Sequence, residues 1–230
     1  MTAPVSDLQL AESRHRYKDP RTGQLTVSVT SIVSNLDTGD KLGAGAGAAV
    51  KLTKAGVDYR KLWNDKRDLG SRVHGYASLW AEGKTADVLE GDGPYLDAFQ
   101  AFCQAKNPQW IESERAVVHS SGYGGRFDLI GEIDGLAYLL DLKCGKPYPL
   151  ELSLQLSAYR YADGMIRYSK DGTAVMLEPM PHIERCAGLY LDETGTAKLV
   201  EVDTDDASFE AFLHLLAVRQ WCDRVKKVKP

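Results

Sequence analysis

The dipeptide Asp134-Gly135 constrains the fold of this sequence more than any other feature. It separates two apolar-rich runs, at 126–133 and 136–143. An Asp-Gly pair in that setting is the strongest short-range signal for a two-residue hairpin turn. The sequence therefore predicts an antiparallel hairpin over these two runs.

The turn also fixes the register of the hairpin. If Ile133 faces Leu136, then Asp128 faces Asp141. Facing residues share one side of the sheet, and every second residue joins them. One side then carries no charge and consists of Phe127, Leu129, Gly131, Ile133, Leu136, Tyr138, Leu140 and Leu142. The other side is mixed and rich in acids, with Arg126, Asp128, Ile130, Glu132, Ala137, Leu139, Asp141 and Lys143.

Two carboxylates in this position need compensation. Like charges directly opposite each other on a sheet are destabilising, and such proximity raises one of the two pKa values. One interpretation is that Asp128 and Asp141 are solvated on an exposed face and are balanced by Arg126 and Lys143. The other is that a hard divalent cation binds between them.

The segment after the hairpin has a helical pattern over 151–164 (ELSLQLSAYRYADG), with Gly164 as the expected stop. Gln155 and Tyr159 are four residues apart and share one helix face. Their polar ends could reach a phosphate or a water molecule. This helix favours the metal interpretation of the hairpin.

The order of these motifs resembles that of RecB-like nucleases in the PD-(D/E)XK superfamily. The G-x-x-D, D-x-K and Q-x-x-x-Y elements of that family match 125–128 (GRFD), 141–143 (DLK) and 155–159 (QLSAY). D-x-K alone is a weak signal, but the ordered set with a hairpin and a helix between its members is specific. The family also has an upstream G-x-x-[VIL]-H element, which 70–74 (GSRVH) resembles.

The resemblance implies a role for each matching position. Metal ligands would be the side chains of Asp128, Asp141 and His74, together with the backbone carbonyl of Leu142. Glu114 is a weaker acidic candidate, for which an ordinary exposed strand residue is an equal alternative. A lone helical histidine is more often packed or surface-exposed, but here it accompanies three other motifs.

The catalytic set implied by the resemblance comprises Asp128, Asp141, Lys143, Gln155 and Tyr159. Lys143 would orient the attacking water or help to deprotonate it, while Gln155 and Tyr159 would hold the substrate backbone or the lysine amine. Phosphodiester hydrolysis needs a nucleophilic water and a sink for charge on the phosphate oxygens, and a divalent ion supplies both. Mg²⁺ suits the sparse oxygen ligands, and a histidine adds tolerance for Mn²⁺.

The composition suits one globular α/β domain, since the chain has 230 residues, 43% of them hydrophobic and 26% charged. We expect a restriction-endonuclease-like fold with a mixed central sheet flanked by helices. In this single PD-(D/E)XK nuclease domain over 1–230, an N-terminal hairpin and helical region (about 1–110) would pack on a catalytic core (about 111–230).

Periodicity and turn signals predict the remaining elements. The expected strands lie at 14–18 and 25–29, around a turn at 19–23, and at 113–119, 183–191 and 197–202. A short helix capped by Thr30 or Ser31 would reach Leu36, and 42–50 would be a hinge or a helix start. Longer helices are expected at 51–80, with breaks at Gly56 and Gly70, and at 94–106 and 205–226.

Several function classes are excluded by what the sequence lacks. The four cysteines form no C-x-x-C pair, and the C-terminal region has only Cys222, so we expect neither disulfides nor an iron-sulfur cluster. Neither G-x-G-x-x-G nor a complete phosphate loop is present, so no nucleotide cofactor is expected. No stretch suits a membrane span or a secretory signal, and we expect a cytoplasmic protein, in the host cytoplasm if it is phage-encoded.

The distribution of charge favours DNA more than the net charge does. The net charge of −4 and the pI of about 5.8 argue against a generic nucleic-acid coat. However, the stretch 51–72 has seven basic residues against three acidic ones. The expected contacts with DNA phosphates come from Lys66, Arg67, Arg72, Arg126 and Lys146.

The sequence thus favours a metal-dependent DNase, an exonuclease in recombination, repair or phage DNA processing. A structure-specific endonuclease is the first alternative. A DNA-binding or assembly module with little catalysis is the second, although a decayed site would be free to lose Lys143. A helicase or recombination protein is an expected partner, because the chain has no motor of its own.

Overall fold

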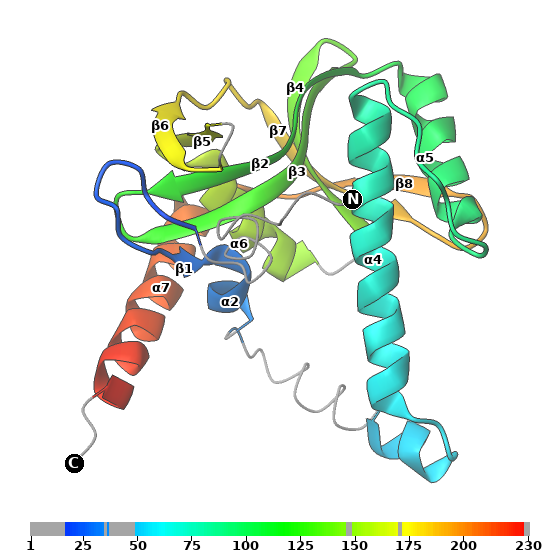
Figure 1. Ribbon diagram of the computed structural model, residues 1–230, viewed down its shortest axis with the longest axis horizontal. Helices are drawn as coiled ribbons and strands as arrows, with labels where there is room; N and C mark the ends of the chain where they lie inside the picture. Colours follow the sequence, from blue (N-terminus) through cyan, green and yellow to red (C-terminus); the bar gives the residue numbers. More distant parts are fainter. Residues whose placement is uncertain (1–16, 35, 37–48, 146–148, 170–171, 228–230) are drawn as a thin grey trace.

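The computed structural model describes residues 17–34, 36, 49–145, 149–169 and 172–227, which form an α/β structure around one mixed sheet (Figure 1). The sheet has eight strands, and helices flank it on both faces, as the sequence predicts. Within these ranges, none of the helices combines the length and the apolar character that a membrane span requires.

The strands follow the order β6-β5-β2-β3-β4-β7-β8, and β1 pairs with β3 outside this path. Their bounds are β1 Val27–Ser28, β2 Gln109–His119, β3 Tyr123–Ile133, β4 Leu136–Cys144, β5 Gly164–Tyr168, β6 Ala174–Glu178, β7 Arg185–Leu191 and β8 Ala197–Glu201. The pairs β1–β3 and β4–β7 are parallel, and the other pairs are antiparallel.

The predicted hairpin turn and its register are confirmed. Asp134 and Gly135 both have positive φ, 52° and 80°, as a two-residue hairpin turn of the mirror-image type requires. Ile133 pairs with Leu136, and the β3–β4 ladder runs from there to the pair Leu129–Leu140. The two aspartates come directly after that last pair.

Both faces of the hairpin are covered by apolar clusters. Leu129 and Leu140 pack with α4 and α5, whereas Ile130 and Leu139 pack with α2, α6 and α7. Phe127 was expected beside Leu129 but lies in the second cluster. The strict alternation of faces therefore fails at Phe127, the residue before Asp128. The facing strand β2 is also irregular at this level, since Glu114 next to Arg115, the partner of Phe127, has a positive φ.

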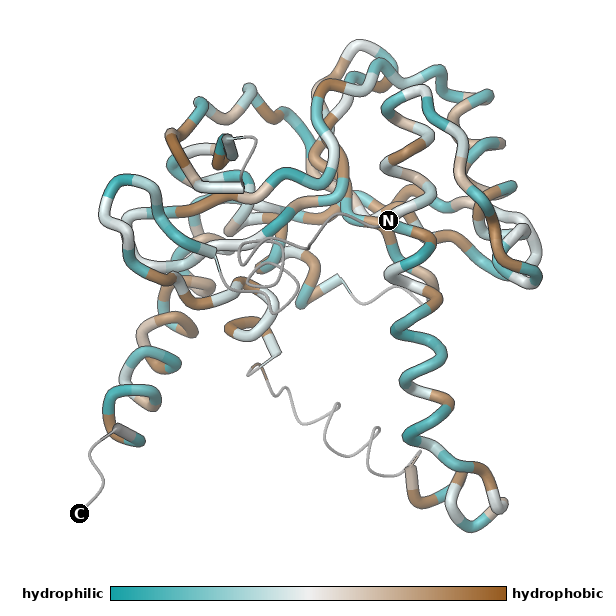
Figure 2. The backbone as a smooth tube through the Cα atoms, viewed as in Figure 1, coloured by the Kyte–Doolittle hydropathy of each residue, from teal (hydrophilic) through white to brown (hydrophobic). Residues whose placement is uncertain are grey.

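Helices form one layer on each face of the sheet (Figure 1). Their bounds are α2 Val29–Val33, α4 Tyr59–Ala81, α5 Gly93–Lys106, α6 Pro149–Arg160 and α7 Asp206–Lys227. Figure 2 shows that hydrophobic residues are frequent in the strands between these layers. The N-terminal half of α4 extends past the sheet and is largely hydrophilic.

Several predicted boundaries were wrong. The helix α6 ends at Arg160, and Gly164, its expected stop, begins β5 instead. A Cβ atom at Gly164 would lie 2.5 Å from the carbonyl oxygen of Glu178, so the glycine serves the close approach of β6. The strands β5 and β6 were not predicted. In contrast, α5, α7, β7 and β8 lie where the sequence placed them, within about two residues.

In the N-terminal region, the predicted break at Gly56 is confirmed by its positive φ of 74°, but α4 continues through Gly70. A Cβ at Gly70 would meet nothing within 4 Å, so this glycine only lowers helix propensity. The short helix α2 begins at Val29, after Ser28, and ends at Val33. The turn at 19–23 is present, with Lys18 bridged to Leu25. The predictions for 14–16 and 42–48 lie outside the described residues.

Candidate functional site

The predicted site residues converge on one cleft of about 680 Å³. It lies between α4, the strands β2, β3 and β4, and α6. Eight of the predicted side chains line it, namely His74, Glu114, Arg126, Asp128, Asp141, Lys143, Gln155 and Tyr159. The sheet and α4 thus bring His74 beside Arg126, Asp128 and other cleft residues that lie more than 50 positions further along the chain.

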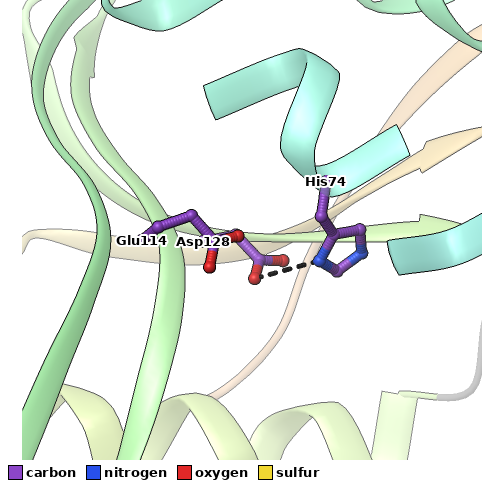
Figure 3. A group of neighbouring side chains, drawn as sticks. All are labelled: His74, Glu114 and Asp128. Atoms are coloured by element: carbon purple, nitrogen blue, oxygen red, sulfur yellow. Dashed lines mark ion pairs between the residues drawn. The ribbon is translucent and has the colours of Figure 1, made fainter. Parts of the chain in front are cut away.

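His74 connects two of the predicted metal ligands. Its Nδ1 lies 3.2 Å from Oδ1 of Asp128 (Figure 3). Its Nε2 lies 2.8 Å from the carbonyl oxygen of Leu142. The other oxygen of Asp128 accepts a hydrogen bond of 2.6 Å from the backbone N–H of Leu142. The helix α4, β3 and β4 are therefore joined at this point by a short polar network.

Glu114 is the third member of this group. Ligand atoms of His74, Glu114 and Asp128 all lie within 4.8 Å of one another (Figure 3). Glu114 has a φ of 47° inside β2, a conformation that costs a non-glycine residue free energy and is concentrated at functional sites. The sequence rated Glu114 only as a weaker candidate, because no sequence pattern reveals positive φ. The pairing of β2 with β3 sets Glu114 opposite Asp128, and this register was the signal that could have made Glu114 a stronger candidate.

Asp141 has different partners from those expected of a metal ligand. Its Oδ2 forms an ion pair with the ammonium of Lys143, and its Oδ1 accepts a hydrogen bond of 2.7 Å from Nε2 of Gln155. The same amide nitrogen lies 3.3 Å from the hydroxyl of Tyr159. The D-x-K and Q-x-x-x-Y positions thus form one connected chain of contacts.

Gly125 allows Tyr159 to occupy its place in the cleft. A Cβ atom at Gly125 would lie 2.4 Å from Cε1 of Tyr159 and 3.1 Å from Cγ2 of Val29. Tyr159 is 1% exposed, so it has no room to withdraw. The glycine of the G-x-x-D element therefore has a steric reason in this chain.

Burial and mutual charge set the protonation of the cleft. Burial disfavours the charged imidazole, but the carboxylates of Asp128 and Asp141 outweigh it and raise the pKa of His74 to about 9. Burial by itself would raise the pKa of Asp128, yet the positive charges of His74 and Lys143 hold this pKa below the usual value. Burial raises the pKa of Glu114, and the charge of Asp128 adds to this effect. His74 is therefore positively charged at neutral pH, and both its ring nitrogens donate.

This arrangement corrects the solvent exposure that the first interpretation of the hairpin assumed, but not its balance of charge. Asp128 and Asp141 are 8% and 2% exposed, so they are not solvated residues of an open sheet face. Cations lie beside the carboxylates, although burial, together with the charge of Asp128, raises the pKa of Asp141 and of Glu114. Three carboxylates, Glu114, Asp128 and Asp141, stand beside three cations, His74, Arg126 and Lys143.

The residues predicted to bind DNA separate into three groups. Arg126 lines the cleft, and its Nη1 lies 3.4 Å from Oε2 of Glu114. Lys66 and Arg67 are exposed on the extending half of α4. Arg72 instead holds the buried carboxylate of Asp92, with its Nε 2.6 Å from Oδ2, and so ties α4 to the start of α5. Lys146 lies outside the described residues.

The sequence did not single out the polar residues that complete the wall of the cleft. They are Tyr17, Ser28 and Thr30 from the N-terminal region, and Ser71 and Ser78 from α4. Small hydroxyl residues on a helix or in a short loop carry no distinctive pattern. They become visible only when the fold sets them beside the carboxylates.

Comparisons with known proteins add little to this geometry. No protein-family model matches the chain, and no curated protein matches it. A solved structure described as "Crystal structure of SSO0001" is similar to it at 12% sequence identity, over 92% of this chain and 80% of that chain, with a TM-score of 0.38. A similarity at this level assigns no function.

Proposed function

We propose that this protein is a divalent-metal-dependent deoxyribonuclease that hydrolyses phosphodiester bonds in the cleft. The observation that carries the proposal is the convergence of His74, Glu114 and Asp128 within 4.8 Å, next to the Asp141–Lys143 ion pair. Strongly perturbed pKa values in a cleft are typical of functional sites.

The proposal includes the fold family. The mixed sheet with a helical layer on each face, and the order of hairpin and helix that carries the motifs, support a single restriction-endonuclease-like domain of the PD-(D/E)XK type. The similarity to RecB-like nucleases rests on the motifs alone, and fold by itself does not imply function.

The donor set suits Mg²⁺ or Mn²⁺. Two carboxylate oxygens and one imidazole nitrogen, from Asp128, Glu114 and His74, form a sparse set that leaves room for water and a substrate phosphate. The carbonyl of Leu142 is free to join them once His74 turns from it. Asp141 would need to exchange its contact with Gln155 or Lys143 to contribute. When bound, the ion would supply an activated water and a sink for phosphate charge.

The residues of the chain have separate tasks in this scheme. Lys143, anchored by Asp141, presents a positive charge that would orient the attacking water, since burial lowers the pKa of its ammonium but the charges of Asp141 and Asp128 outweigh this and raise it. Gln155 fixes the carboxylate of Asp141 through its amide. Arg126 reaches the cleft beside Glu114 and can contact a phosphate oxygen, because guanidinium groups pair well with phosphates.

We further propose that the activity is exonucleolytic, in recombination, repair or phage DNA processing in the cytoplasm, with a helicase or recombination protein as partner. The similarity of the motifs to those of RecB-like nucleases supports this activity, and the cleft is bordered by two helices and a sheet, so that a DNA end can enter it. A structure-specific endonuclease is the competing outcome of the experiment below.

The test compares linear, nicked and covalently closed DNA in Mg²⁺, Mn²⁺ or a chelator. We expect linear DNA to be shortened with either metal, closed circles to survive, and the chelator to stop the reaction. The variant Lys143→Met should lose at least about a hundredfold in rate, the scale for a central electrostatic group. The control Lys198→Met removes an exposed lysine from β8 of the same sheet.

Two results would contradict the proposal. Equal rates for both lysine variants would move the chemistry away from the cleft. Closed circles nicked as fast as linear DNA is shortened would select the endonuclease.

A further inference from the structure

The helix α4 carries an uninterrupted polar line from its free end to the cleft. The positions alternate in steps of four and three residues, which keeps them on one face of a helix. The line consists of Arg60, Asn64, Arg67, Ser71, His74 and Ser78, and we call it the polar stripe.

The polar stripe is continuous with the proposed site. Its last three members, Ser71, His74 and Ser78, line the cleft. Its first three, Arg60, Asn64 and Arg67, are exposed on the half of α4 that extends past the sheet (Figure 1). From Arg60 to His74 the stripe spans about 21 Å, at about 1.5 Å per residue.

The stripe does not belong to the packing face of the helix. The buried residues of α4 are Val73, Tyr76 and Ala77, and Leu69 packs against the same core. Counted at about 100° per residue, Leu69, Val73 and Tyr76 lie about 100° or more from every stripe residue around the helix axis, and Ala77 lies about 60° from His74. The centre of the packing face is therefore on the other side of the helix from the centre of the stripe. Packing in the described part of the chain therefore gives no reason for this row of polar residues.

Two aromatic rings lie beside the arginines of the stripe. Tyr59 and Trp63 are one turn apart, with ring centroids 5.2 Å from each other, and Trp63 is 45% exposed. Trp63 precedes Arg67 by four residues, so the two side chains are neighbours on the helix surface. An exposed tryptophan next to a guanidinium is the combination with which proteins hold single-stranded nucleic acid, by stacking bases and contacting phosphates.

The charge of this segment supports the same ligand. Arg60 and Arg67 are accompanied by Lys61 and Lys66 on a chain whose net charge is −4. In the free protein Arg67 contacts the adjacent Asp68, with Nη2 3.2 Å from Oδ1 and both side chains more than half exposed. Exposed pairs of this kind contribute little, so a phosphate can replace the aspartate.

We infer that the polar stripe is the track along which a single strand of DNA reaches the cleft. Arg60 and Arg67 contact its phosphates, and Tyr59 and Trp63 stack on its bases. This inference rests on the proposed nuclease function, and it adds the substrate class. Bases of a duplex are stacked inside and closed to Trp63, so a single strand is the form that uses both the rings and the arginines.

The test measures binding separately from cleavage. Fluorescence anisotropy of a labelled oligothymidylate of about 12 nucleotides, a length within the usual site size, is followed in a chelator at several salt concentrations. The double variant Arg60→Gln/Arg67→Gln should lower the slope of log affinity against log salt by about 1.4, since each lost phosphate contact on a single strand contributes about 0.7. The control Lys106→Gln/Lys198→Gln removes the same charge from exposed positions of α5 and β8, away from the stripe.

A second pair of variants tests base stacking. Trp63→Ala should weaken binding of the oligothymidylate at least about fivefold, the lower end for one stacked base. The control Trp221→Ala removes a tryptophan of α7 that is 56% exposed. The same oligonucleotide paired with its complement should bind more weakly to the wild type and be indifferent to Trp63→Ala.

The outcomes separate this inference from the proposed function. Four results would each overturn the inference that the polar stripe binds single-stranded DNA. They are equal loss of affinity in the two charge variants, no effect of Trp63→Ala, preference for the duplex, and no binding of the single strand by the wild type. Metal-dependent cleavage of linear DNA by the same preparations would leave the nuclease proposal intact. Absence of that cleavage would overturn the nuclease proposal, whatever the binding shows.

Discussion

Single residues of the cleft combine local strain with charge, and Glu114 shows this most clearly. Its positive φ disfavours any side chain with a Cβ, and its burial beside Asp128 raises the pKa of its carboxyl. Neither feature stabilises the fold. Both are understandable if the carboxylate is retained for a ligand, because functional sites often keep such unfavourable arrangements.

Because of this strain and this burial, we expect an unusual response to Glu114→Gly. In a chelator the variant should be at least as stable as the wild type, because glycine adopts positive φ without strain and the carboxyl of Glu114, whose pKa burial raises, is removed. The control Ser113→Gly changes the preceding strand residue and should lose about 0.5 to 1 kcal/mol. Urea unfolding measures both, and calorimetry should show that Glu114→Gly binds Mn²⁺ more weakly. A destabilised Glu114→Gly with unchanged Mn²⁺ affinity would make Glu114 an ordinary structural residue.

At the scale of elements, the sequence predicted those parts that local chemistry determines. The hairpin followed from Asp134-Gly135 and from apolar runs with a period of two. The strands β5 and β6 were missed because Gly164, the first residue of β5, was interpreted as the end of a helix. The structural reason for this glycine is the close approach of β6, which is distant in the sequence. Likewise the prominence of Glu114 depends on backbone conformation, which tertiary contacts impose.

The connection between α4 and α5 gives a pH-dependent prediction. Arg72 lowers the pKa of Asp92 through hydrogen bonds, against the effect of burial, and Tyr76 adds a hydrogen bond of 3.1 Å. A lowered pKa means that this stabilisation is complete above the ordinary value of 3.8 and is lost as the pH falls through the lower folded value. Asp92→Asn should therefore unfold at lower urea concentration than the wild type at pH 7.

The difference should shrink as the pH falls below about 4, since protonation of Asp92 then removes the pair from the wild type as well. The exposed Asp97 of α5 provides the control, and Asp97→Asn should match the wild type at both pH values. A gap between wild type and Asp92→Asn that stays constant across this range would show that lost packing, and not the ion pair, causes the effect.

At the scale of the whole molecule, metal binding and folding should be coupled. A ligand that binds only the folded state stabilises it by mass action, by about 2.7 kcal/mol at a hundredfold excess over Kd. We expect Mg²⁺ and Mn²⁺ to raise the melting temperature of the wild type. Asp128→Asn should gain much less and should also be less stable in the chelator, because Asp128 balances His74 and accepts the N–H of Leu142.

The control for this experiment is Glu132→Gln, which removes an exposed carboxylate from the same strand. It should respond to metal as the wild type does. A variant Asp128→Asn that is more stable than the wild type in the chelator would mean that repulsion among the carboxylates outweighs their pairing with His74 and Lys143. The charge balance described for the cleft would then be wrong.

The Asp134-Gly135 turn has a consequence for how this protein can vary. Exposed turns are the usual places where chains gain or lose residues without harm. Here one added residue would move every later side chain of β4 to the opposite face and take Asp141 and Lys143 out of the cleft. Substitutions in the turn should therefore be tolerated more readily than insertions or deletions. The comparable turn at 193–195 between β7 and β8 carries no cleft residue downstream, and insertions should accumulate there instead.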